Sequence, residues 1–276
     1  MKKKLFMITL LLLLSAFAFA AQGCGSEAKS AQDSSSLTTS TPETEILDDI
    51  LKNISKASSM LKSCQSNISY LFIQDPDILE SKTLRVGKLF YLKENNRSKL
   101  RIRFDQIQQD DFETEEYTED YYFDGVWLTK VDYKLEQVDL YQQAPEDAPI
   151  DVFELISHNF PLVGFSGAEA LQKDFDVSLE DPVVSDPNKP IQLHLLVKKD
   201  SEYQDEYTKI NFWIDPHTYL PSRVMAYSTQ GDIYDIRFLD QKMNKNFKNA
   251  VFKVETPAHF SKNIQALETG SPKKGK

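Results

Sequence analysis

The sequence predicts a mainly β protein with few helices, folded as a curved, incomplete antiparallel β-barrel that helices cap. Apolar and polar residues alternate with period two in about ten or eleven segments, which is typical of half-buried strands. These segments follow one another at hairpin spacing, without the alternation of strand and helix that a parallel sheet requires. Only three segments have helical spacing, a long one before the strands and two short ones near 151–159 and 168–173. A sheet this large must twist, curl or close.

The chain begins like an exported protein. Three lysines precede an apolar run from Leu5 to about Ala21, which is short for a membrane span and typical of an export signal. We therefore expect residues 1–23 to be a signal peptide. Processing has two alternatives: an A-x-A pattern favours release after Ala20, and a sequence similar to a bacterial lipobox favours lipid attachment at Cys24. The protein would then be periplasmic and either freely diffusing or anchored to a membrane.

Two segments lack the large apolar side chains that a packed core requires. Residues 24–44 are rich in Ser and Thr and are predicted to be a disordered tether, and residues 263–276 a disordered tail. Residues 45–262 are enough for one large β-barrel domain. Without residues 1–23, the chain carries 42 acidic and 29 basic side chains, a formal charge of −13, which argues against a nucleic-acid partner.

An amphipathic helix opens the domain. Apolar residues recur at spacings of three and four from Ile46 to Cys64, and Thr41-Pro42 suits the cap and the first helical position. Cys64 continues the apolar stripe, which places its thiol in the core as a small apolar group. A disulfide between Cys64 and Cys24 would tie a floppy tether to a buried face and is the less favoured alternative.

The strands follow this helix. Residues 99–105 alternate cleanly, with Leu100, Ile102 and Phe104 on one face and three basic residues on the other. Asp124-Gly125 provides a two-residue turn suited to positive φ. Further strands or hairpins are expected at 69–74, 84–92, 121–131, 136–142, 175–180, 191–198, 208–214, 222–228, 232–240 and 250–255.

No catalytic or metal-binding motif occurs in the sequence. The four histidines are not spaced like metal ligands, and G-x-S-x-G, P-loop and H-E-x-x-H patterns are absent. The acidic run at 110–122 could bind calcium, but it lacks the glycine and the ligand spacing of an EF-hand loop. A charged hairpin end that discourages edge pairing is the favoured interpretation. We predict that the protein is not an enzyme and has no metal or cofactor.

Aromatic residues in the strands are candidates for a lipid-binding lining. One long helix and two short ones could cover only part of the concave side, and the uncovered part would form an apolar cavity. The alternative is an ordinary filled barrel or sandwich, in which the same residues form the core. An acyl chain in such a cavity gains about 0.8 kcal/mol per buried CH₂ group. The candidate lining residues are Phe72, Phe90, Phe104, Trp127 and Phe212.

Two stretches of the sequence resemble the periplasmic outer-membrane lipoprotein carrier family, LolA and its anchored relative LolB. Residues 121–142 have the family's Asp-Gly hairpin, aromatic strand, turn and Gln-Val strand. Residues 210–260 resemble its closing region of paired strands and an asparagine-bearing turn. The opening helix and residues 87–104 follow the family's order, so the resemblance covers about residues 45–262.

The resemblance implies a carrier that holds the acyl chains of lipoproteins or other lipids. Its partners would be an inner-membrane release complex and an outer-membrane acceptor, and the short helices within 151–173 would act as a lid. The family controls cargo retention with an arginine on an early strand, usually followed by proline. Arg97 is the nearest positional match, with Arg101 and Arg103 on the following strand, and no Arg-Pro occurs there. The alternative is an envelope scaffold or sensor of the same fold that binds a protein partner.

Overall fold

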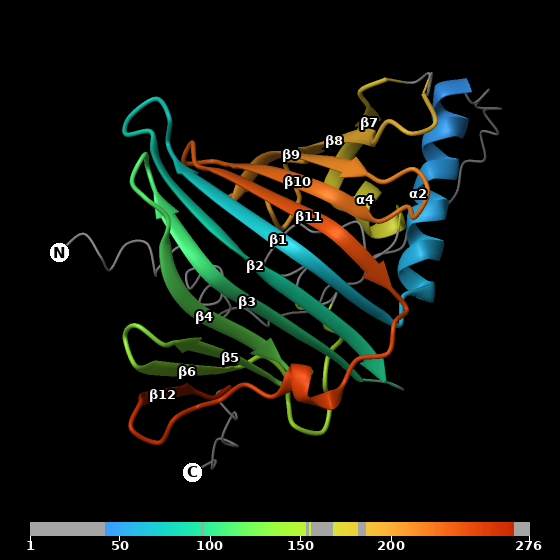
Figure 1. The fold of residues 1–276 in the computed structure, drawn as a ribbon. Coiled ribbons are helices and arrows are strands. Elements are labelled where there is room, and N and C mark those ends of the chain that lie inside the picture. Colours follow the sequence, from blue (N-terminus) through green and yellow to red (C-terminus); the bar gives the residue numbers. More distant parts are fainter. Residues whose placement is uncertain (1–41, 95–96, 153–154, 156–167, 182–185, 268–276) are drawn as a thin grey trace, which may run out of the picture. The chain divides into compact units, whose positions relative to one another are not determined.

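The described structure is dominated by one β-sheet (Figure 1). Contacts divide the chain into residues 1–45 and residues 46–276, and the fold described below is that of the second unit with the first turn of its opening helix. The computed structural model describes residues 42–94, 97–152, 155, 168–181 and 186–267.

Twelve strands and few helices make up the described residues, which confirms the predicted fold class. The helices are α2 (Pro42–Met60) and α4 (Ala168–Asp174), with a 3₁₀ turn η2 (Asn249–Phe252). The strands are β1 (Ser63–Gln74), β2 (Ser81–Glu94), β3 (Arg97–Gln109), β4 (Glu115–Phe123), β5 (Trp127–Asp132), β6 (Gln137–Gln142), β7 (Phe175–Leu179), β8 (Ile191–Val197), β9 (Tyr207–Ile214), β10 (Pro221–Ser228), β11 (Ile233–Met243) and β12 (Ser261–Gln265).

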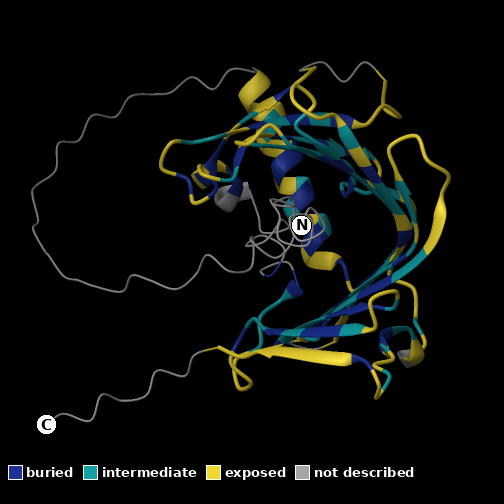
Figure 2. Cartoon of the chain, turned by 90° about the vertical axis from the view of Figure 1, so that its left-hand side faces the viewer, coloured by how far each residue is buried: buried dark blue, intermediate teal, exposed yellow. Residues whose placement is uncertain are grey.

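The strands lie in the order β12-β6-β5-β4-β3-β2-β1-β11-β10-β9-β8-β7. Most neighbours are consecutive in the chain, as hairpin spacing predicts, and the central pair β1–β11 joins the N-terminal and C-terminal halves. All pairs are antiparallel except β12 with β6, which is parallel. The sheet is open, because β12 and β7 are its two edges, and it curves in an arc with α2 inside the curve (Figure 2).

The inner face of this arc is the one that packs on α2. Ala57 of α2 and Leu61, the residue after its end, belong to one apolar cluster with Cys64, Tyr91 and Leu100 of the sheet. We call this side the concave face and the opposite side the convex face. Because side chains alternate along a strand, the register assigns each strand residue to one of these faces.

Helix α2 begins at Pro42, as expected, but ends at Met60, four residues before Cys64. The prediction that Cys64 continues the helix is therefore wrong: Cys64 lies on β1, opposite Tyr91 and Met243. Sheet pairing on both sides satisfies the backbone of this segment, so it competes successfully with another helical turn. The thiol is buried and free, as expected for a small apolar core group.

A bulge between β2 and β3 shows why one glycine is required. The register shifts between Val86 and Gly87, where β2 crosses close to β3. A Cβ atom at Gly87 would lie 1.9 Å from the carbonyl oxygen of Arg103. Bulges of this kind increase local twist and bending, which contributes to the curvature of the sheet.

The C-terminal residues differ from the prediction. The strand expected at 250–255 is a 3₁₀ turn followed by a segment that crosses the convex face; its Phe252 and Phe260 are buried. The apolar residues of 250–255 alternate because their side chains pack against the sheet, and not because this segment pairs as a strand of it. Strand β12 was not expected, because all five of its residues are exposed and no alternation marks it. It extends to Gln265, into the segment predicted to be a tail.

Candidate functional site

The concave face carries an apolar cluster made by neighbouring strands. Its buried members are Ile68, Phe104 and Ile236, from β1, β3 and β11. Among the described residues, every member comes from a strand and none from α2. The half-buried side chains that pack against it are Tyr70, Leu89, Ile102, Tyr121 and Phe238.

Aromatic rings give this concave cluster a continuous surface. The rings of Tyr70 and Phe104 are 6.3 Å apart between centroids, and Phe104 meets Tyr121 edge-on at 6.2 Å. Such pairs contribute about 0.5–1.5 kcal/mol each beyond the burial of their area. Because Leu89, Ile102 and Phe238 are only half-buried, part of this apolar surface remains accessible.

A buried ion-paired group borders the concave cluster. Lys130 Nζ lies 2.8 Å from Glu119 Oε1, and Arg85 Nε lies 3.6 Å from Glu119 Oε2. Glu119 is 1% exposed and pairs across the sheet with Phe104. Burial, and secondly the negative charge of Glu119, raise the pKa of Tyr121 well above its ordinary value. The concave face is therefore amphipathic, with an apolar strip ending at fixed charges.

Three of the five predicted aromatic lining residues lie on the concave face. Phe104 is in the concave cluster, and Phe72 contacts Tyr234 with ring centroids 5.3 Å apart. Phe212 is buried and pairs with Val224 of β10 and Leu193 of β8.

The structure does not bring the other two aromatic residues to that face. Phe90 alternates with Tyr91, so it points to the convex side, where its ring lies 6.1 Å from that of Phe247. Trp127 is also on the convex side, and its Nε1 donates to Glu146 at 2.7 Å. Period two separates two faces of a strand but does not say which of them is concave.

The three candidate arginines, Arg97, Arg101 and Arg103, share one face of β3 and project from its convex side. Arg97 is exposed at the start of the strand. Arg101 and Arg103 form ion pairs with Asp120 on β4. None of them is on the apolar concave face, and a role for Arg97 in lipid binding stays a prediction.

Some predictions concern residues outside those described. Cys24, the signal peptide and nearly all of the tether lie outside, so lipidation stays a prediction. Of the expected lid at 151–173, the structure describes Asp151, Val152, Leu155 and α4. Val152 is buried in the cluster at the end of α2, and its backbone N–H donates to Ser98 Oγ at 2.7 Å.

The acidic run divides into an exposed turn and a partly buried strand. Residues 110–114 form the turn between β3 and β4, as expected, while Glu119 and Asp120 on β4 are buried in ion pairs on opposite faces. These pairs leave no local signal in the sequence, because their partners lie on other strands. The described residues contain no cluster of side chains that could hold a metal ion, and no described helix is long and apolar enough to cross a membrane.

Solved structures with a similar fold are known. An uncharacterized conserved protein from Thermus thermophilus has a TM-score of 0.47 at 13% identity, over 79% of this chain and 99% of its own. MucB in the MucA/MucB complex of Pseudomonas aeruginosa has a TM-score of 0.41 at 11% identity, over 75% of this chain and 60% of its own. A LolA superfamily protein from Nitrosomonas europaea has a TM-score of 0.32 at 14% identity, over 75% of this chain and 97% of its own.

No protein-family model and no curated protein matches the sequence. A likeness at 11–14% identity concerns the fold alone.

Proposed function

We propose that the protein is a non-enzymatic periplasmic carrier that shields the acyl chains of lipoproteins or other lipids on its concave face. The observation that supports this most is the concave cluster, where half-buried Leu89, Ile102 and Phe238 extend a packed apolar surface. Each CH₂ group of an acyl chain that replaces water there contributes about 0.8 kcal/mol. Such binding needs no catalytic group.

The ion-paired group beside the concave cluster would orient a bound lipid. An acyl chain gains nothing from Arg85, Glu119 or Lys130, whereas a polar head group can hydrogen-bond to them. A bound lipid would therefore lie with its tail along the apolar strip and its head toward β4 and β5. Export by residues 1–23, lipid attachment at Cys24, and delivery from an inner-membrane release complex to an outer-membrane acceptor belong to this proposal.

A matched pair of variants on β2 tests the proposal. Leu89 lies on the concave face, and its neighbour Lys88 is exposed on the convex face. We expect Leu89→Ser to weaken the binding of a fluorescent fatty acid by about tenfold, since it removes most of one apolar side chain from the contact. Lys88→Ser should leave binding unchanged, and circular dichroism should show both variants folded.

Lipid extraction and native mass spectrometry of protein purified from its own host provide the second measurement. We expect acyl-bearing cargo that is lost from the Leu89→Ser variant. If wild-type protein carries no acyl-bearing molecule and binds no probe, the carrier proposal is wrong. Copurification of one envelope protein in a fixed ratio, without lipid, would instead favour the scaffold or sensor function.

A further inference from the structure

Two neighbouring hairpin turns present large apolar side chains to solvent at one end of the sheet (Figure 1). We call them the paired tips: residues 75–80 between β1 and β2, and residues 110–116 between β3 and β4, which include the first two residues of β4. Ile78 is 80% exposed and Phe112 is 72% exposed, the two highest values among the large apolar side chains of the described residues. Leu79 is 62% exposed.

The first of these turns is closed by its own hydrogen bonds. The backbone N–H groups of Ile78 and Leu79 each donate to the carbonyl oxygen of Asp75 at 3.0 Å. The N–H of Asp75 donates to Asp232 Oδ1 at 3.0 Å, which attaches this turn to the turn between β10 and β11. An ordered turn therefore presents the side chains of Ile78 and Leu79 to solvent.

The second turn is attached to the first. The N–H of Asp110 donates to the carbonyl oxygen of Lys82 at 2.8 Å, and the N–H of Lys82 donates to Asp110 Oδ1 at 2.6 Å. Within the turn, the N–H of Phe112 donates to the carbonyl oxygen of Gln109 at 3.0 Å. The carbonyl oxygen of Phe112 accepts from Gln108 Nε2 at 3.0 Å. The two turns therefore adjoin, and hydrogen bonds on both sides fix the backbone of Phe112.

Turn geometry does not account for these apolar residues. Turns favour Gly, Pro, Asn, Asp and Ser, and an apolar side chain that faces solvent contributes no burial to the fold. Single exposed apolar side chains are common, whereas a group of them marks a contact surface. Three such side chains lie on two adjoining turns here, and one of them is aromatic, a type enriched at the centre of protein interfaces.

The paired tips are also strongly acidic. Residues 75–80 carry three carboxylates and residues 110–116 carry five. Lys82 Nζ lies 3.0 Å from Glu80 Oε1. Lys134 Nζ, from the turn between β5 and β6, lies 3.3 Å from Glu115 Oε2. With these two lysines counted, six carboxylates remain in excess around the exposed apolar side chains.

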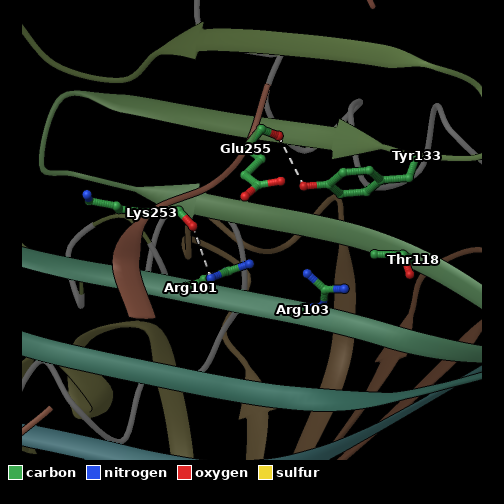
Figure 3. Close-up of a pocket in the computed structure, with 6 residues that line it drawn as sticks. All are labelled: Arg101, Arg103, Thr118, Tyr133, Lys253 and Glu255. Atoms are coloured by element: carbon green, nitrogen blue, oxygen red, sulfur yellow. Dashed lines mark hydrogen bonds between the residues drawn. The ribbon is translucent and has the colours of Figure 1, made fainter. Parts of the chain in front are cut away.

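The polar pocket on the convex face does not share this excess (Figure 3). The cations that line it are Arg101, Arg103 and Lys253. Asp120 and Asp105 form ion pairs with the two arginines, and the carboxylate of Glu255 also lines the pocket. Charge is thus balanced at that pocket and unbalanced at the paired tips.

We infer that the paired tips bind a partner protein whose surface has an apolar pocket ringed by lysines and arginines. Phe112 and Ile78 enter that pocket, and the surrounding carboxylates pair with the basic ring, which steers the approach and selects the partner. The excess carboxylates would repel an anionic membrane surface and also a second copy of this chain, whose net charge is −10. No residue of the paired tips belongs to the concave cluster, so the inference holds whether or not that cluster binds acyl chains.

Fluorescence anisotropy with three labelled synthetic peptides tests the inference on the full mature chain. The first peptide is a helix of lysine and leucine with one apolar stripe, the second has serine in place of leucine, and the third has glutamate in place of lysine. We expect the lysine–leucine peptide to bind at least about tenfold more tightly than the other two, because only it supplies both the apolar and the basic contacts.

Matched variants locate the binding of the lysine–leucine peptide. Phe112→Ser should weaken it by about tenfold, as expected for a central aromatic contact. Ile264→Ser is the control, because Ile264 is 63% exposed on β12, outside the paired tips. Leu89→Ser should also leave this binding unchanged, which separates the paired tips from the concave cluster. Asp111→Asn/Glu113→Gln should weaken binding and reduce its dependence on salt.

The inference is refuted if the lysine–leucine peptide does not bind, if the lysine–serine peptide binds equally well, or if Phe112→Ser and Ile264→Ser behave alike. Two other measurements assign a different occupant and would also overturn it. One is binding to phosphatidylcholine vesicles that Phe112→Ser abolishes, which would indicate a membrane. The other is self-association in analytical ultracentrifugation that the same variant abolishes, which would indicate a second copy of the chain.

Discussion

Asp120 is expected to be a main determinant of stability on the convex side of the sheet. Its side chain is fully buried and accepts two short hydrogen bonds from Arg101, whose side chain is 12% exposed. In Asp120→Ala, the guanidinium of Arg101 would remain largely buried without its counter-charge. Removing one partner of a buried ion pair typically costs about 3–5 kcal/mol. For a domain of this size, that corresponds to a fall of about 6–20 °C in the melting temperature.

Thermal unfolding followed by circular dichroism measures this loss. The matched control is Asp105→Ala, which removes an exposed carboxylate that pairs with Arg103, and its cost should stay below about 1 kcal/mol. The double variant Asp120→Ala/Arg101→Met should be more stable than Asp120→Ala alone, because no charge is then left unpaired.

Hydrogen exchange locates the effect. Arg101 also donates to the carbonyl oxygens of Val251 and Lys253, so its displacement should increase exchange in residues 251–260. The reasoning is refuted if Asp120→Ala melts within about 2 °C of the wild type, or if the double variant is less stable than the single one.

Two further predictions concern the cysteines. In a Cys24→Ala background, the Cys64 thiol should react with a disulfide reagent only after urea unfolding, because burial raises its pKa to about 11, and rapid reaction of the native protein would contradict this. Since the pKa of Cys64 is higher in the folded state, its contribution to stability is complete below the ordinary thiol pKa and is lost as the pH rises toward about 11. If Cys24 is acylated, Cys24→Ala should move the protein from the membrane fraction to the soluble periplasm and lower the intact mass by more than the side-chain change. Unchanged fractionation would favour the freely diffusing form.

Local pattern was enough for much of the fold. The alternation of Leu100, Ile102 and Phe104 with basic residues correctly predicted a strand with one apolar face, because side chains of a strand alternate whatever the strand pairs with. Asp124-Gly125 correctly marked the β4–β5 turn, where Gly125 has a φ of 102°, although the connection has three residues, 124–126, rather than the two expected. The start of α2 at Pro42 was likewise predicted from that proline and from the apolar spacing that follows it.

The candidate sites depended on contacts between distant segments. Phe90 and Phe104 lie on opposite faces of the sheet. Alternation along each strand does not show this, because only the β1–β11 and β2–β3 pairings define which face is concave. The Glu119 pairs and the Arg101–Asp120 pair join side chains of different strands, and no local spacing encodes such contacts.

The sequence by itself determined a mainly antiparallel sheet and the two faces of each strand. These properties depend on composition and on periods of two and 3.6 residues, which act within a few residues of the chain. Only the tertiary structure decided that Cys64 belongs to β1, that residues 251–260 cross the convex face, and that β12 pairs in parallel with β6. The physical reason is that curvature, strand partners and buried charge pairs arise from long-range packing, which can outweigh local preference.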